Sequence, residues 1–492
     1  MLRITERRAI HPRVPGFVER SVMQAFGHRA SSTPGRPLGP GLDRRQLLRA
    51  IGVTAGLASF PGLVAACGSD GGGGGDNASG DLLVWYWGEQ EAAGLKKFFE
   101  AQVQAYNAAG TDSAGEVKAV LQESDTLYTA FRTAAEAKNG PDVQFFWGGT
   151  QALEDVWMGN VEPLDDHVSS DFLDQLDTDA RRETYWDGKQ WGMPFYQIGT
   201  AWAYNKVMFA KAGLDPEVPP ATWDEFVAAL TALKKSGVVP LGAGFKDAYL
   251  GGWLISYLGG QNFDSIDDAI AVFRGETEYA GPKYTEWLDR LKELIDRGLF
   301  NDDVLSIDLY QGQQMFESQQ AAITNSVQPQ IVGFERKLGA DTVGVMRTPV
   351  YGTGALADFF PAPSQVLTIT SFSPRQDRAG TFLEYLHEPK VMKAMYEACG
   401  AITPDKRFDP AWLNTEADKK MAEWKSSLPN FWYQYYYPFP FERDGVTPGV
   451  QQLFQPGGSV SAAVKTMQEA IDKWRREQPA QVKAYQQWQL LS

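Results

Sequence analysis

The sequence is poor in the residues that build disulfides and metal centres, because its 492 residues include only 2 cysteines and 4 histidines. Cys67 and Cys399 lie far apart, and neither shares a metal-like spacing with a histidine or with the other cysteine. His387-Glu388 begins like a zinc-peptidase helix, but Val391 stands where that motif needs its second histidine. We therefore expect neither a disulfide framework nor a metal site.

The usual motifs of acyl-transfer and nucleotide chemistry are also missing. The chain contains no G-x-S-x-G elbow and no G-x-x-x-x-G-K-[ST] loop. Residues 352–357 imitate a dinucleotide fingerprint, but they follow Pro349 rather than a strand, and Pro361 prevents a helix from continuing, so we predict a plain loop and no cofactor. The 61 acidic residues leave a glycosidase pair of carboxylates open as an alternative.

Long hydrophobic runs are scarce as well. Residues 50–66 carry no charge, but Gly52 and Pro61 interrupt them, and the segment is too short and too weakly apolar for a permanent membrane helix. It follows Arg44-Arg45, and a basic stretch before a modest apolar stretch is typical of an export signal. The paired arginines resemble a twin-arginine signal, so we predict that residues 1–66 are a signal for export.

Residues 63–69, L-V-A-A-C-G-S, resemble a bacterial lipobox, in which Cys67 receives a diacylglyceryl group and becomes the first residue of the mature chain. Two acyl chains anchor a protein stably, since each buried methylene contributes about 0.8 kcal/mol. The alternative, a small buried cysteine, fits poorly beside the glycines at 71–75. We predict a flexible tether over residues 67–80 and a lipid anchor at the extracellular face of the cell membrane.

The composition is that of a globular protein, with 43% hydrophobic and 22% charged residues. The length exceeds what one ordinary core fills, so two domains are expected. The net charge of −15 is uneven, because residues 1–66 carry +7 and the remaining chain carries −22. A body this acidic repels phosphate backbones, so nucleic acid is not an expected partner.

Hydrophobic periodicity predicts an α/β fold. Strands are expected over residues 82–87, 117–122 and 142–147, with helices over 95–106 and 126–138 between them. A strand-helix-strand-helix-strand order predicts a mainly parallel sheet covered by helices.

The second half of the chain repeats this kind of pattern without an internal sequence repeat. Thr222 and Glu225 form a capping box that starts a helix, Gly237 ends that helix, and residues 238–241 are extended. We therefore predict a second α/β lobe.

Several segments together resemble the extracellular sugar-binding lipoproteins of ABC importers. Residues 185–195, Y-W-D-G-K-Q-W-G-M-P-F, begin the most specific part of the resemblance. The segments that follow them have the same order and spacing as in the family. The other segments that carry the resemblance are residues 142–143, 147, 161–165, 204–206, 212–214, 219–226, 253, 259–260, 321–323 and 402–404.

This resemblance implies a two-lobed periplasmic-binding-protein fold with hinge-connected lobes. By resemblance, residues 81–195 and 348–398 form the first lobe, and residues 196–347 and 399–492 form the second. Such proteins are monomers that bind a carbohydrate ligand and hand it to an ABC permease and its ATPase, and they catalyse nothing. A secreted carbohydrate-active enzyme and a surface scaffold lipoprotein remain as alternatives.

A pyranose presents apolar C–H faces that stack on aromatic rings and hydroxyls that need polar partners. Ligands of open α/β sheets bind beyond the carboxyl ends of strands, and the resemblance adds positions in the second lobe and at the first crossing. Gln328 stands where many relatives have tryptophan, and Thr150 where an acidic residue is common. The ligand-binding candidates are Trp87, Glu89, Asp125, Trp147, Tyr196, Tyr249, Trp253, Asn325 and Gln328.

Each aromatic candidate has core packing as its alternative role. Residues 433–437, with Phe439 and Phe441, form a dense aromatic cluster that also has two alternative roles. It either lines the cleft or packs a long loop.

Overall fold

The computed structural model describes residues 79–110, 113–124, 126–247 and 249–491. The predicted export signal, Cys67 and most of the predicted tether lie outside the described residues. Asp125 lies outside them too. Within the described part of the chain, no helix is both long and apolar enough to cross a membrane.

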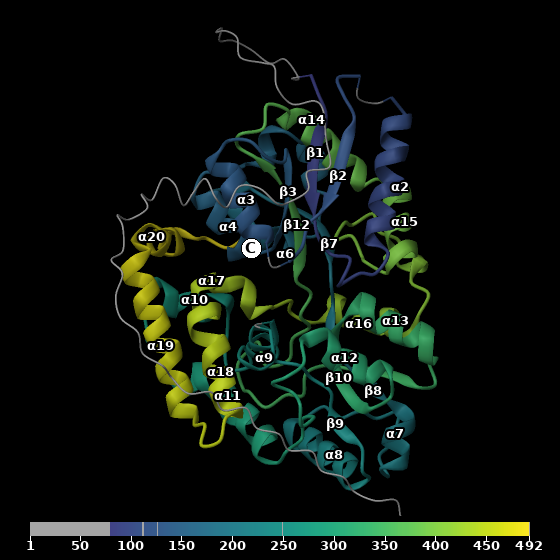
Figure 1. Ribbon diagram of the computed structural model, residues 1–492, viewed down its shortest axis with the longest axis vertical. Helices are drawn as coiled ribbons and strands as arrows, with labels where there is room; N and C mark the ends of the chain where they lie inside the picture. The colour runs from purple at the N-terminus through teal and green to yellow at the C-terminus, as the bar shows by residue number, and fades with distance from the viewer. Residues whose placement is uncertain (1–78, 111–112, 125, 248, 492) are drawn as a thin grey trace, which may run out of the picture. The chain divides into compact units, whose positions relative to one another are not determined.

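The first sheet has the strand order β2-β1-β3-β12-β4, and β7 pairs with β12 off this path (Figure 1). β1 runs parallel to both β2 and β3, which confirms the predicted order in the first third of the chain. The sheet is mixed rather than mainly parallel, because β12 arrives from far along the chain and runs antiparallel to β3, β4 and β7. The strands are β1 Leu82–Tyr86, β2 Val117–Leu121, β3 Val143–Trp147, β4 Val161–Glu162, β7 Met193–Gln197 and β12 Ser364–Thr370.

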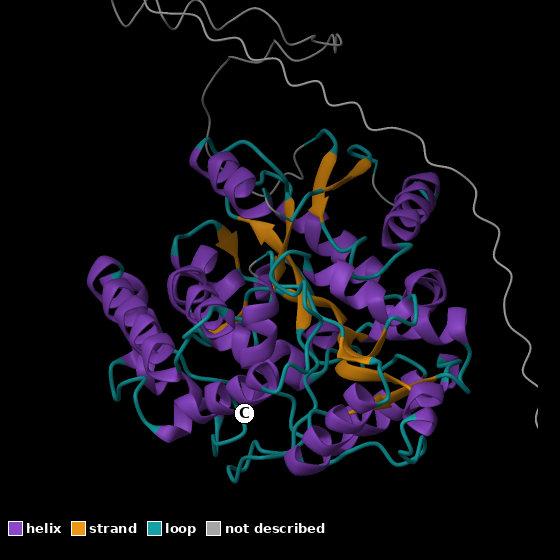
Figure 2. Ribbon diagram, turned by 60° about the horizontal axis from the view of Figure 1, so that its bottom comes forward, coloured by secondary structure: helices purple, strands orange, loops and turns teal. Residues whose placement is uncertain are grey.

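Helices surround the strands of both sheets (Figure 2). Around the first sheet, α2 buries Leu95, Phe98, Phe99 and Tyr106, which lie on one face of the helix expected over residues 95–106. Phe99 stacks on Tyr86 of β1 with ring centroids 3.9 Å apart, so the helical stripe meets the strand directly. The helices of this part are α2 Leu95–Ala108, α3 Leu127–Glu136, α4 Thr150–Trp157, α14 Gln376–Leu386 and α15 Pro389–Cys399.

The second sheet has the strand order β11-β8-β10-β9. β8 is antiparallel to both β10 and β11, whereas β9 is parallel to β10. Nearly every residue of these strands is buried, which requires helices on both faces. The strands are β8 Thr200–Asn205, β9 Val239–Leu241, β10 Ala321–Val327 and β11 Val343–Met346.

The helices of the second part include α8, which begins with the predicted capping box. The Thr222 side chain accepts a hydrogen bond from the Glu225 backbone N–H, and the Glu225 carboxylate accepts one from the Thr222 backbone, so this prediction is confirmed. The helices are α7 Lys206–Lys211, α8 Trp223–Lys235, α9 Tyr249–Leu258, α10 Ile266–Arg274, α11 Pro282–Asp296, α12 Leu309–Glu317, α13 Gln328–Leu338, α16 Glu416–Ser427, α17 Phe439–Phe441, α18 Thr447–Phe454, α19 Val460–Glu477 and α20 Pro479–Gln487.

Short elements complete the chain. Asp187 and Gly188 have φ values of 51° and 75°, the two positive values that a tight hairpin turn between β5 and β6 requires. The short elements are β5 Tyr185–Trp186, β6 Lys189–Gln190, α5 Ser170–Leu173, α6 Thr178–Arg182, the 3-10 helices η1 Leu164–Asp166, η2 Pro410–Trp412 and η3 Tyr433–Tyr436, and the π-helix η4 Glu442–Val446.

The chain passes between the two sheets several times, which makes the fold two-lobed. It leaves the first sheet after β7 and enters the second at β8, returns between β11 and β12, and leaves again after α15. The first and third crossings touch, because the Gln197 N–H donates to the Ile402 carbonyl at 2.8 Å. We call the first sheet with its helices the first lobe, and the second sheet with its helices the second lobe.

Residues 352–357 are a loop, as predicted, and this loop packs on the second lobe. The Gly354 N–H donates to the Gln261 carbonyl at 3.0 Å, and the Leu356 N–H donates to the Phe263 carbonyl at 2.9 Å. A Cβ on Gly352 would lie 2.2 Å from the Gln261 carbonyl oxygen, so the glycine is needed for this close approach.

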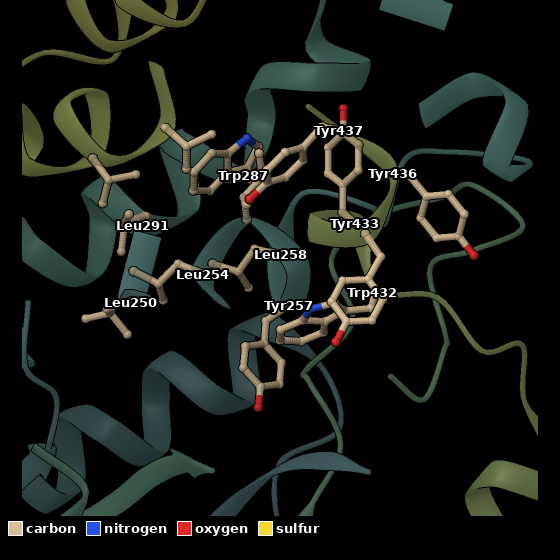
Figure 3. Packing of buried hydrophobic residues seen from close by; sticks show 14 of the residues in the cluster. Leu250, Leu254, Tyr257, Leu258, Trp287, Leu291, Trp432, Tyr433, Tyr436 and Tyr437 are labelled. Carbon is tan, nitrogen blue, oxygen red and sulfur yellow. The ribbon is translucent and has the colours of Figure 1, made fainter. Parts of the chain in front are cut away.

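Most of the C-terminal aromatic cluster is core. Tyr433 and Tyr437 lie near the apolar side chains of α9 and near Trp287 of α11 (Figure 3), and Tyr436 stacks on Phe431 and Trp488. Tyr433 and Tyr437 contact each other edge to face with centroids 5.5 Å apart, and both are buried. Cys399 is also buried, which confirms its interpretation as a small apolar residue.

Candidate functional site

A cavity of about 460 Å³ lies where the carboxyl ends of β1 and β3 meet the second sheet. Its size is typical of sites for small ligands. Nine aromatic side chains line it, together with polar side chains from both lobes. The aromatic residues are Trp87, Tyr128, Trp147, Tyr249, Trp253, Tyr310, Trp432, Tyr435 and Phe439.

The first-lobe wall of the cavity is a row of aromatic rings. Trp87 follows β1 and Trp147 ends β3, and their ring centroids lie 4.9 Å apart. Tyr128, in the first turn of α3, stacks on Trp147 at 5.6 Å with an interplanar angle of 28°. The Tyr128 hydroxyl donates to Gln151 of α4 at 3.0 Å, so the phenol ring is held in place. These rings offer an apolar surface with a fixed orientation.

The second-lobe wall is built on α9 and on the segment before η3. Trp253 of α9 meets Trp432 nearly at right angles, with centroids 6.1 Å apart. The Trp432 indole N–H donates to Gln434 at 3.1 Å. Tyr249 and Tyr310, from the starts of α9 and α12, complete this wall. The cavity therefore has aromatic surfaces on two sides.

Glu91 brings a buried carboxyl to the cavity. It is 6% exposed and accepts a hydrogen bond from the hydroxyl of Tyr196, which is wholly buried, at 3.2 Å. Loss of hydration raises the pKa of Glu91 to about 8. Gly88 allows this contact, because its φ is +132° and a Cβ there would lie 2.4 Å from the Tyr196 hydroxyl.

Glu442 is a second buried carboxyl on the cavity wall, at the start of the π-helix η4. The Gln434 side-chain amide donates to both of its oxygens, at 2.9 and 2.8 Å, and the Tyr437 hydroxyl donates at 3.1 Å. Burial raises the pKa of Glu442 to about 7. α9 approaches this group closely, since a Cβ on Gly252 would lie 2.7 Å from a Glu442 oxygen.

Two further polar groups on the wall have an oxygen without a hydrogen-bond partner among the described residues. One is Oδ1 of Asp247, whose other oxygen accepts from the Leu309 N–H at 3.4 Å, and whose pKa burial raises. The other is Oε1 of Gln365 in β12, a residue that is 1% exposed. A buried oxygen without a partner costs about 1–3 kcal/mol, so both are acceptors suited to a ligand's hydroxyl donors.

The ionisable groups at the cavity are mainly carboxyls. Glu91, Asp247 and Glu442 line it, and Arg443 is the one cation on its wall among the described residues. Arg443 is engaged by Asp444, with N···O distances of 2.6 and 2.9 Å. An anionic ligand would therefore meet carboxyls without a free cation to balance it.

Four of the predicted ligand-binding residues line this one cavity, namely Trp87, Trp147, Tyr249 and Trp253. Two of them come from each lobe. Trp87 also packs in the core of the first lobe, so it has both of the roles considered for it.

The other predicted residues that the structure describes do not line the cavity. The Glu89 carboxylate accepts from the Gly94 and Lys96 N–H groups, at 3.0 and 2.6 Å, and so caps the start of α2. Tyr196 lies behind the wall and holds Glu91.

Asn325 and Gln328 also lie away from the cavity. Asn325 is buried in β10, where its carbonyl accepts from Gln313 at 3.1 Å. The Gln328 amide donates to the Gly400 carbonyl at 2.8 Å and to the Asp418 carboxylate, which ties α13 to the third crossing. The glutamine at 328 therefore serves packing between crossing segments.

Thr150 has an equally structural role. Its hydroxyl donates to the Tyr437 carbonyl at 2.6 Å, and it is fully buried. The preceding Gly149, with φ +65°, passes so close to Tyr435 that a Cβ would lie 2.0 Å from that carbonyl oxygen. The end of β3 is thus fastened to the C-terminal aromatic segment.

The C-terminal aromatic cluster has both of the roles that the sequence left open. Tyr435 and Phe439 line the cavity, whereas Tyr433, Tyr436, Tyr437 and Phe441 do not and pack in the core. Tyr128, Glu91, Asp247, Gln365 and Glu442 are wall residues that the sequence patterns missed.

No cluster of three or more His, Cys, Asp or Glu side chains placed to hold a metal ion occurs within the described ranges. The wall chemistry of rings, amides and carboxyls suits a ligand with apolar faces and hydroxyl groups.

The two-lobed fold, with a cavity lined from both lobes, defines the class of solute-binding proteins that close on a ligand. The family model described as bacterial extracellular solute-binding protein matches residues 87–393, which is more than half of the chain. This chain belongs to that family.

Individual relatives are distant. The chain is 29% identical to the diacetylchitobiose-binding protein DasA of Streptomyces coelicolor over 40% of this chain and 45% of the relative. It is 24% identical to the sn-glycerol-3-phosphate-binding periplasmic protein UgpB of Brucella abortus over 44% and 49%. The chain thus spans about half the length of these relatives.

Among solved structures, a chitin oligosaccharide binding protein superposes with a TM-score of 0.69 at 19% identity. The match covers 80% of this chain and 99% of that one. This likeness shows the two-lobed fold.

Proposed function

We propose that this protein captures a mono- or oligosaccharide in the cavity between its lobes and delivers it to an ABC permease and its ATPase. The observation that carries the proposal is the aromatic lining: Trp87 and Trp147 on one side face the same 460 Å³ space as Trp253 and Trp432 on the other. Sugar rings stack on such surfaces through their C–H faces, and closing the lobes would cover both faces of one ring.

Polar groups support a ligand rich in hydroxyls. Oδ1 of Asp247 and Oε1 of Gln365 lack partners among the described residues and accept hydrogen bonds. Glu442 is held by two donors from the protein, so its orientation is set before a ligand arrives. The ligand would be recognised by pre-positioned groups rather than by rearranged ones.

The charge of the wall favours an uncharged sugar over a phosphate ester. UgpB is named for a phosphorylated ligand. In this chain Arg443 is paired with Asp444, and three carboxyls share the wall. A phosphate would find no free cation to balance its charge unless it displaced that pair, which is electrostatically unfavourable.

A glycosidase is the second candidate, and one observation favours it. Glu91 has a pKa raised to about 8, and a carboxyl that stays protonated near neutral pH is what a general acid requires. We favour the receptor, since DasA and UgpB are both named as binding proteins and the family is one of solute-binding proteins.

The two candidates separate in one experiment. Thermal-shift screening is run on the purified protein with mono- to pentasaccharides of α-1,4-glucose, β-1,4-glucose, β-1,4-xylose and β-1,4-N-acetylglucosamine. A saturable rise in melting temperature with unchanged sugar supports the receptor, because a ligand that binds only the folded state stabilises it. Shortened sugars in the mixture would support the glycosidase, and a flat response to the whole panel would contradict both.

We also propose the placement of the protein. Cys67 would carry the lipid, residues 67–80 would be the tether, and the mature monomer would face the outside of the cell. A Cys67→Ser variant should then leave the membrane fraction and appear in the medium. An unchanged membrane fraction would contradict the anchor.

The lobe boundaries form part of the same proposal. Residues 81–197 and the sheet-forming part of 348–398 make the first lobe, since β7 runs two residues past the expected boundary at 195 and pairs with β12, and residues 198–347 and 399–492 make the second. Because the Gly354 and Leu356 N–H groups bond to the second lobe, we place the return crossing nearer to Pro363 than to residue 348.

A further inference from the structure

A second pocket, of about 360 Å³, adjoins the first. Both are lined by Tyr128, Thr129, Gln151, Phe439 and Arg443, so they share a wall. The second pocket lies between α3 and α4 of the first lobe and α17, η4 and α19 of the second. Its remaining lining comes from Arg132, Glu154, Pro440, Asp444, Lys473, Trp474, Glu477, Gln478 and Gln481.

A row of rings leads from the inner cavity to this pocket. After Trp147, Tyr128 lies at 5.6 Å and stacks in turn on Phe439 at 6.3 Å, with interplanar angles of 28° and 26°. Phe439 is 42% exposed, one of the few large apolar side chains open to solvent. Its backbone N–H donates to Glu154 at 3.2 Å, so the backbone that carries the exposed ring is fixed to α4. The three near-parallel rings form a continuous aromatic border from the first pocket to the second, which gives a linear glycan an apolar surface to run past.

The lining of the second pocket is richer in paired charged side chains than that of the first. Arg132 bonds Glu154 and Asp155, each at 3.1 Å. Asp444 holds both Arg443 and Lys473, the latter at 2.9 Å. These ion pairs engage most of the charged side chains of the pocket and leave donors and acceptors at their rims, which suit hydroxyl groups.

Amide groups at the far end of the pocket are held as well. The Gln481 carbonyl oxygen accepts from the Trp474 indole N–H at 2.9 Å, which turns the Gln481 side chain toward α19. Trp474 itself is 1% exposed, so it positions the amide and belongs to the core.

We propose that the two pockets are parts of one groove, and that the ligand is a linear oligosaccharide of at least three units that runs past the rings of Trp147, Tyr128 and Phe439 and ends at Lys473 and Gln481. This inference rests on the proposed function and narrows its ligand from any sugar to a chain longer than one pocket holds. A chain in both pockets touches α3 and α4 on one side and α19 on the other, so it links the lobes at two places.

The test is a calorimetric titration over ligand length. Mono-, di-, tri-, tetra- and pentasaccharides of the four series named above are titrated into the purified protein and into three variants. Gln481→Ala and Lys473→Ala alter the far pocket. Gln486→Ala is the matched control on the same helix as Gln481, because its amide bonds the Arg274 carbonyl at 3.1 Å and lies outside both pockets.

In at least one series the affinity should rise tenfold or more from the monosaccharide to the trisaccharide. Gln481→Ala and Lys473→Ala should each weaken the trisaccharide and longer chains about 3- to 10-fold, as expected for a lost hydrogen bond or pair. The affinity for the shortest ligand that binds, and every affinity of Gln486→Ala, should stay within twofold. Circular dichroism confirms that each variant is folded.

Two results would overturn the groove. One is an affinity that does not increase with saccharide length, and the other is an unchanged affinity of both far-pocket variants for saccharides of every length. Either result would contradict the single groove and leave the proposed function intact. If no saccharide of any length binds the unmodified protein, the proposed function fails and the groove fails with it.

Discussion

Removal of the Trp147 ring is the sharpest perturbation of the cavity. Trp147 ends β3, is half-buried, and contacts Trp87 and Tyr128 at 4.9 and 5.6 Å, so its free face belongs to the cavity. A sugar face that covers on the order of 80 Å² of indole contributes about 2 kcal/mol at 25 cal/mol per Å². Trp147→Ala should therefore raise Kd about 30-fold for the tightest saccharide.

The assay is calorimetric titration, with two companion variants. Trp147→Phe keeps a smaller ring and should lose less affinity than the alanine variant. Trp412→Ala removes another half-buried indole, one that contacts Phe408 at 5.0 Å and does not line the cavity, and should leave Kd unchanged. An unchanged Kd for Trp147→Ala, in a variant that melts as a folded protein, would refute the reasoning.

Three further predictions concern stability and its coupling to the site. Glu442 has a pKa of about 7 when folded and 4.5 as an ordinary carboxyl, so its contribution to stability is full below pH 4.5 and is lost as pH rises toward 7, on the order of 3 kcal/mol. Urea unfolding of Glu442→Gln should show a flatter pH dependence than the unmodified protein between pH 4.5 and 7, and parallel curves would contradict this. Gly88→Ala places a side chain at φ +132° and close to the Tyr196 hydroxyl, so it should lower the melting temperature. Because Tyr196 holds Glu91, the same variant should also weaken saccharide binding. An unchanged affinity would contradict this coupling between Gly88 and the cavity. Thr222→Ala removes the α8 cap and should cost about 1 kcal/mol in chemical unfolding without a change in Kd; a large loss of affinity would show that α8 influences the cavity.

Local patterns predicted the local elements well. The strands β1, β2 and β3 and the helices α2 and α3 lie within two residues of their expected ends, because alternating and helical hydrophobic spacing is a property of neighbouring residues. The position of β12 could not be predicted in this way. It joins the first sheet antiparallel, from far along the chain, and no local pattern specifies such a partner.

The same division holds for the cavity. Trp87 and Trp147 follow from the rule for strand ends, because they succeed parallel strands directly. Gln365 was missed because β12 is antiparallel and presents its beginning rather than its end to that edge. Glu442 was missed because a π-helix sets its direction, and this has no clear sequence signal.

Glu89 illustrates a competing explanation that the sequence already contained. A carboxylate just before a helix satisfies free backbone N–H groups, and Glu89 does this for Gly94 and Lys96. Its position after a strand suggested the cavity instead. Where a strand end and a helix start lie this close together, the carboxylate between them accepts hydrogen bonds from the free N–H groups of the helix and does not reach the cavity.

A crystal structure of the protein with the saccharide that gives the largest thermal shift tests the central claim most directly. We expect an intact sugar between the lobes, with one ring face on Trp147, the opposite side near Trp253, and hydroxyls donated to Asp247 and Gln365. A sugar bound elsewhere on the protein, with this cavity left to solvent, would contradict the account.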